Sequence, residues 1–175
     1  KKGQELPEPP AVTLRPAADH EVGRIKGEVL RLGGHSAAAH NTLIAPYVRG
    51  ERDARLLAAL GLDEKASGND VRARKFLEAA AAANVQRARA HLELGRLRLA
   101  EVRAKPAAPD GQLDAAQVTA VLTPLFTARK QPPPMAEVYS LIAETWSLSI
   151  TRPQAEHLGV VIEGVRMFPR DIALL

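Results

Sequence analysis

Cysteine is absent from this sequence of 175 residues, and aromatic side chains make up only 3% of it. Without cysteine the chain has no disulfide framework, no thiolate nucleophile and no cysteine-based zinc site. One Trp, two Tyr and three Phe leave few platforms on which single-stranded nucleic acid could stack. No apolar run approaches the roughly 18 residues that span a bilayer, so we expect no membrane insertion.

Blocks of basic residues are also missing, although the formal net charge is +4. The 24 Lys and Arg residues are interleaved with 20 Asp and Glu residues along the chain. This pattern is typical of a solvated surface of mixed charge, and we favour that interpretation over nucleic-acid binding.

Motifs for catalysis and for cofactor binding are missing as well. The sequence contains no phosphate-binding glycine loop, no dinucleotide-binding fingerprint and no nucleophile elbow. Its five histidines form no HExxH motif, and His35 and His40 are too far apart in register to share a helix face cleanly. We therefore expect no enzyme activity, no cofactor and no metal in these residues.

Alanine and leucine dominate the apolar 46% of the chain, which favours helices over strands. Residues 1–18 carry four prolines and are expected to form an extended arm or linker. Apolar periodicity and caps then predict eight helices, with short connections that place neighbours antiparallel, at about 19–32, 37–49, 54–66, 71–83, 86–104, 114–130, 135–149 and 152–168. The expected N-caps include Ser36, Asp53, Asn69 or Asp70, and Thr151. Pro124 is expected to bend the sixth helix, and residues 170–175 to begin a ninth. The predicted fold class is all-α.

Three glycines inside these helices are equally spaced, because the numbers of Gly27, Gly61 and Gly95 differ by a constant interval of 34. The same interval separates Ala39 from Ala73 in the second helix of each pair. A period of 34 with two helices per unit is the signature of tetratricopeptide repeats.

The chain from about residue 20 onward resembles the tetratricopeptide-repeat family. The resemblance implies an α-α superhelix of about four repeats, at about 20–53, 54–87, 88–134 and 135–169, with a further helix starting at 170–175. The third repeat contains an insertion, since Gly95 and Ala143 are 48 apart instead of 34.

The resemblance also implies which residues pack the repeats together: Gly27, Gly61, Gly95, Ala143, Ala39, Ala73 and Trp146. His91 falls at a packing position, and we interpret it as structural. Glu64 and Arg98 stand where the family has a large apolar residue. We expect their aliphatic stems to cover apolar surface while their charges reach water.

A superhelix of this kind lines a concave groove with its first helices, and such grooves bind peptides or protein partners. The resemblance implies that the groove presents Arg24, Glu28, Arg31, Arg55, Leu62, Lys65, Arg89, Leu92, Arg96, Glu137, Ser140 and Glu144. The first three repeats are mainly basic on this face and the fourth is acidic. Our hypothesis is that the groove prefers an acidic segment or a free carboxylate. The alternative is that these are ordinary solvated charges.

The leading functional prediction is a non-catalytic protein–protein interaction scaffold within a larger, bacterial protein. An alternative is a C-terminal accessory domain of a larger enzyme, such as a bacterial membrane-associated or secreted peptidase. A third hypothesis is self-association, through the apolar face of the last full helix that truncation of the helix starting at 170–175 would expose. The sequence does not indicate a cellular compartment.

Overall fold

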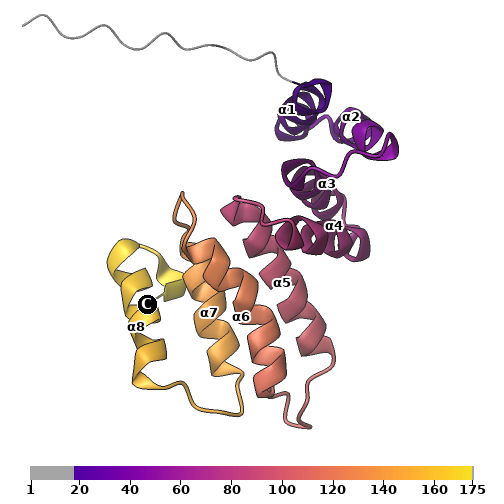
Figure 1. Cartoon of the computed structure of the whole chain (residues 1–175). Coiled ribbons are helices and arrows are strands. Elements are labelled where there is room, and N and C mark those ends of the chain that lie inside the picture. The colour runs from indigo at the N-terminus through magenta and orange to yellow at the C-terminus, as the bar shows by residue number, and fades with distance from the viewer. Residues whose placement is uncertain (1–17, 175) are drawn as a thin grey trace, which may run out of the picture.

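The computed structural model describes residues 18–174, so the predicted arm lies almost entirely outside the described residues. The described chain is all-α, as predicted, with one isolated β-bridge between Leu113 and Ser149. Its eight α-helices are shown in Figure 1: α1 (Asp19–Leu32), α2 (Ser36–Val48), α3 (Ala54–Ala66), α4 (Asp70–Ala82), α5 (Ala88–Ala104), α6 (Ala115–Arg129), α7 (Ala136–Ser147) and α8 (Ala155–Met167).

The helices pack as four consecutive pairs, α1–α2, α3–α4, α5–α6 and α7–α8. The second helix of each of the first three pairs also packs against the first helix of the next pair. The first helices contact one another in turn, α1 with α3, α3 with α5, and α5 with α7. This stacking confirms the predicted α-α superhelix and gives the molecule a surface built from first helices.

Glycine allows the two helices of a pair to approach closely. A Cβ added to Gly27 would lie 2.5 Å from Leu43 Cγ, and one added to Gly61 would lie 2.6 Å from Leu77 Cγ. In the third pair, a Cβ on Gly95 would overlap Leu125 in the same way. The close contact thus outweighs the cost of glycine in a helix, about 1 kcal/mol relative to alanine.

The insertion between α5 and α6 is anchored to the loop between α7 and α8. The backbone N–H of Leu113 donates to the carbonyl of Leu148 at 2.7 Å, and that of Ile150 donates to the carbonyl of Leu113 at 3.0 Å. The Leu113 side chain is fully buried in the core cluster that α5, α6 and α7 share. The additional residues therefore contribute to the core as well as extending a loop.

Some of the expected helix starts are confirmed, and two are wrong. The carboxylate of Asp53 caps α3 by accepting from the backbone N–H groups of Arg55 and Leu56. Ser36 is the first residue of α2 and not its N-cap, which is His35. α8 begins at Ala155 and not near Thr151. Pro153 disfavours helical geometry at Arg152, the residue before it, so the helix starts after the proline.

A ninth α-helix is not present in the described residues after α8. Ile172–Leu174 form a single 3-10 turn, η1, that packs on α7 and α8 and buries Leu174. The Asp171 carboxylate accepts a hydrogen bond from the N–H of Ala173 at 3.0 Å, which stabilises this turn. Pro124 lies within α6, which continues on both sides of it from Ala115 to Arg129.

The expectation for Glu64 is also wrong, because its carboxylate does not reach water. Glu64 is buried, with Asn69 Nδ2 donating to Oε2 at 2.9 Å and Arg72 Nε lying 3.3 Å from Oε1. Asn69 therefore bonds to this carboxylate instead of capping α4 with its side chain. Arg98 is half-buried, and its guanidinium donates to the carbonyl of Ala120 at 2.9 Å.

Candidate functional site

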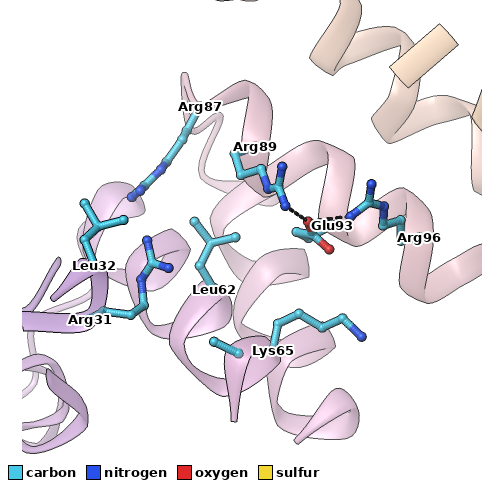
Figure 2. Close-up of a pocket in the computed structure, with 9 residues that line it drawn as sticks. Arg31, Leu32, Leu62, Lys65, Arg87, Arg89, Glu93 and Arg96 are labelled. Atoms are coloured by element: carbon cyan, nitrogen blue, oxygen red, sulfur yellow. Dashed lines mark hydrogen bonds and ion pairs between the residues drawn. The ribbon is translucent and has the colours of Figure 1, made fainter. Parts of the chain in front are cut away.

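An open pocket of about 520 Å³ lies between the first helices of the first three pairs (Figure 2). α1 contributes the end of its last turn, α3 its last two turns, and α5 its N-cap and first turns. The lining residues are Arg31, Leu32, Leu62, Lys65, Ala66, Arg87, Arg89, Glu93 and Arg96. Five of these side chains are cationic and one is a carboxylate, so the pocket has an excess of positive charge.

The single carboxylate in the lining, Glu93, is buried and already paired. Arg89 Nη2 lies 2.9 Å from Glu93 Oε1, and Arg96 Nη1 donates to the same oxygen at 3.2 Å. The three residues occupy neighbouring turns of α5, at spacings of four and three residues. Glu93 therefore fixes two guanidinium groups of the lining, and Figure 2 shows Arg89 and Arg96 on either side of the Glu93 carboxylate.

Arg87 is held by a carboxylate from the first helix. Its Nη1 and Nη2 donate to Glu28 Oε1 and Oε2, both at 3.0 Å, and Arg24 donates to Glu28 Oε1 at 2.8 Å. A bidentate ion pair of this kind fixes the orientation of the guanidinium plane. It also links the start of α5 to α1, although the pair α3–α4 lies between them in the sequence.

Arg31 and Lys65 are the two cations of the pocket that hold neither Glu28 nor Glu93. Lys65 Nζ donates to Asp70, an exposed residue, at 2.8 Å. Among the described residues, the Nε of the Arg31 guanidinium is buried without a hydrogen-bond partner. Both side chains line the pocket, as Figure 2 shows. An anion entering the pocket would meet donors that no carboxylate of the described chain saturates.

The structure brings together only part of the groove expected from the sequence. Arg31, Leu62, Lys65, Arg89 and Arg96 line the pocket, whereas Arg24 and Glu28 form the pair beside it. Arg55 is exposed and is not a lining residue.

The acidic fourth pair is engaged in ion pairs with α5. Glu137 Oε1 lies 3.5 Å from Arg89 Nη1, and Glu144 pairs with Arg103. These carboxylates join α7 to α5, so the acidic residues of the expected groove serve partly to connect neighbouring pairs. Leu92 is buried and Ser140 is half-buried, with its hydroxyl donating to the carbonyl of Ala136.

Four lining residues were missed at the level of sequence: the apolar Leu32 and Ala66, and the charged Arg87 and Glu93. Arg87 is the N-cap of α5, so a face defined by positions within the helix does not include it. Glu93 could have been found from its spacing to Arg89 and Arg96, because residues three and four apart on a helix are neighbours.

The expected packing residues occupy the interior of the array. Gly27, Gly61, Gly95, Ala39, Ala73 and Trp146 are buried, and Ala143 is half-buried. His91 is buried as well, with its Nε2 2.9 Å from the carbonyl of Val85. This contact connects α5 to the loop before it and leaves the histidine away from the basic pocket.

In residues 18–174, no cluster of three or more His, Asp or Glu side chains is arranged to hold a metal ion. None of the helices described combines the length and apolar character needed to cross a membrane. The sequence matches no protein-family model and shows no match to a curated protein. The assignment of function therefore rests on the residues and geometry of the chain itself.

Proposed function

We propose that this chain is a non-catalytic, tetratricopeptide-like scaffold whose basic pocket binds an acidic segment or a free carboxylate of a partner protein. The observation that carries the proposal is the convergence of five cationic side chains and one paired carboxylate on an open pocket. The lining comes from the first helices of three successive pairs, the surface that repeat scaffolds use for ligands.

The repeat architecture supports this proposal through a recurring contact. Gly27 faces Leu43 in the first pair, and Gly61 faces Leu77 at the same sequence separation in the second. Gly95 faces Leu125 across the insertion of the third pair. The glycines that recur at a constant interval in the sequence thus each contact a leucine in the second helix of their pair. A ligand that binds the pocket would contact three successive units at once.

The chemistry of the lining suits anionic groups such as carboxylates. Guanidinium groups offer paired donors that match the two oxygens of a carboxylate, and such charge-assisted bonds are stronger than neutral ones. Leu32 and Leu62 add apolar surface within the same pocket. An Asp or Glu side chain has an aliphatic stem for these leucines and an anionic end for the cations.

The test is titration calorimetry with an acidic peptide and with its isostere, in which every Asp and Glu is Asn and Gln. We expect only the acidic peptide to bind, and its affinity to fall as added salt screens the charges. The double variant Arg31→Gln/Lys65→Gln should bind at least about ten-fold more weakly, a loss of about 1.4 kcal/mol. These two positions are chosen because Arg87, Arg89 and Arg96 each hold Glu28 or Glu93, and substitution of any of them would remove a partner from a carboxylate that is at least half-buried.

A matched control is Lys130→Gln/Arg166→Gln, which removes the same charge from two exposed positions outside the pocket. It should bind the acidic peptide as the wild type does. Equal, weak binding of both peptides to all proteins would contradict the proposal, since the charges would then be ordinary solvated ones.

A further inference from the structure

The outer face of α1 carries a stripe of apolar side chains that is open to solvent. Val22, Ile25, Val29 and Leu32 follow one another at spacings of three, four and three residues. Their exposed fractions are 52%, 52%, 63% and 76%. This spacing places all four side chains on one side of the helix. We call this set the α1 stripe.

The packing of α1 explains why the stripe remains uncovered. Among the residues of α1, only Gly27 is buried, and it faces α2. In α3 and α5, the corresponding outer side is covered by the second helix of the preceding pair. No pair precedes α1 within the described residues, so its outer side has no such cover.

The α1 stripe runs into the basic pocket. Leu32, its last member, lines the pocket together with Leu62, and Figure 2 shows the two leucines on neighbouring helices. Val29 is one turn before Leu32, and Ile25 and Val22 continue in the same direction. A ligand that leaves the pocket beside Leu32 would therefore pass onto apolar surface.

The charges beside the stripe are acidic in the first turn of α1, at Asp19 and Glu21, and basic nearer the pocket. Lys26 is exposed on α1 between Ile25 and Gly27, and Arg31 precedes Leu32. The carboxylate of Glu28, on the same helix, is bound by Arg24 and Arg87. Charge complementarity thus favours an occupant whose acidic residues lie toward the pocket end of the stripe.

From this continuity we propose that the partner is an amphipathic acidic segment. Its acidic residues bind the pocket, and the adjoining apolar side chains, spaced three and four residues apart as in a helix, cover the α1 stripe. This inference rests on the proposed function, because the pocket supplies the anchor and the stripe selects among acidic segments. An acidic segment with a polar continuation would use only half of the site.

The experiment compares two peptides with the same acidic part. One continues with apolar residues at helical spacing, and the other continues with serines at those positions. Calorimetry on the wild type should show at least about ten-fold tighter binding of the apolar peptide, a difference of about 1.4 kcal/mol. The variant Val22→Ser/Val29→Ser should lose this preference and keep its affinity for the serine peptide.

The matched control is Val48→Ser/Val71→Ser, which replaces two valines that are 77% and 67% exposed on α2 and α4. It should retain the full preference of the wild type. Equal affinity of the two peptides for the wild type would overturn this inference and leave the proposed function standing. Failure of both peptides to bind the pocket would overturn the two together.

A second copy of this chain is the other occupant that the experiment can detect. Light scattering on the free protein should give the mass of a monomer. A dimer that Val22→Ser/Val29→Ser abolishes would assign the α1 stripe to self-association and overturn the inference.

Discussion

At the scale of single residues, the glycines of this chain divide into those that touch a partner helix and those that do not. Gly61 and Gly164 lie against Leu77 and Tyr139, at distances that leave no room for a Cβ. Gly159, inside α8, has no neighbouring atom within 4 Å of the position where its Cβ would be. Glycine is therefore required by close packing at Gly61 and Gly164, whereas at Gly159 it only lowers the stability of the helix.

Substitution of Gly61 by alanine should destabilise the protein. The added methyl group must displace Leu77, and overpacking of this kind costs about 1–3 kcal/mol, more than the gain in helix propensity. Gly159→Ala is the matched control, and it should raise the free energy of unfolding by up to about 1 kcal/mol. Urea denaturation of the two variants measures the difference. A stabilised Gly61→Ala protein would contradict the close approach of α3 and α4.

At the scale of elements, the last three helices are joined by one cluster of polar side chains. Arg129 of α6 donates to both carboxylate oxygens of Glu163 in α8, and the Tyr139 hydroxyl of α7 donates to Glu163 Oε1 at 2.8 Å. The hydrogen bonds from Arg129, and then from Tyr139, hold the pKa of Glu163 below its usual value. Burial, followed by the hydrogen bond to Glu163, raises the pKa of Tyr139.

The lowered pKa of Glu163 predicts how stability should depend on pH. A carboxyl group with a depressed pKa contributes stability above its ordinary pKa, about 4.3 for Glu, and loses it as the pH falls through the folded-state value. Glu163→Gln should therefore lower the free energy of unfolding near neutral pH by less than about 1 kcal/mol, since the Glu163 side chain is 40% exposed. The gap between the variant and the wild type should close in acid.

The measurement is chemical denaturation of both proteins at a series of pH values from neutral to acid. Tyr139→Phe serves as the second variant, because it removes one of the hydrogen bonds that lower the pKa of Glu163. The folded-state pKa of Glu163 should then lie closer to its ordinary value, so the stability from Glu163 should be lost over a narrower pH range. A gap that stays constant into strong acid would show that the ionised form of Glu163 contributes nothing.

At the scale of the whole molecule, the core is concentrated in the middle of the array. α5 contributes side chains to two core clusters, Leu92 and Leu99 to one and Leu94 and Leu97 to the other. In contrast, the only buried residue of α1 is Gly27, and that of α8 is Gly164. Stability in repeat proteins is approximately a sum of local terms, so the two end helices, α1 and α8, should open first.

Hydrogen exchange of the backbone amides should reveal this gradient. We expect amides of α1 and α8 to exchange at least about ten-fold faster than those of α3 and α5, because little apolar surface holds the outer helices in place. The acidic amphipathic peptide should slow exchange in α1 selectively. Uniform protection across all eight helices would indicate one cooperative unit and contradict the prediction.

The apolar periodicity of the sequence, together with its helix-capping and helix-breaking residues, was sufficient to place eight helices and to predict their pairing. Apolar spacing, caps such as Asp53, and the recurrence of glycine at a constant interval are local properties of the chain. Errors occurred where a neighbouring residue changes the local geometry, as Pro153 does at the start of α8. The last turn, Ile172–Leu174, also differs, because a short segment has too few residues to show a helical period.

The candidate site, by contrast, was decided largely by the tertiary structure. The sequence placed Arg31, Lys65, Arg89 and Arg96 on one face, but it could not show which cations are already neutralised. Pairing of Arg87 with Glu28 joins residues 59 positions apart, and that distance is bridged only when three helix pairs stack. Charge along a chain is set by composition, whereas the charge available to a partner depends on which carboxylates the fold brings within bonding distance.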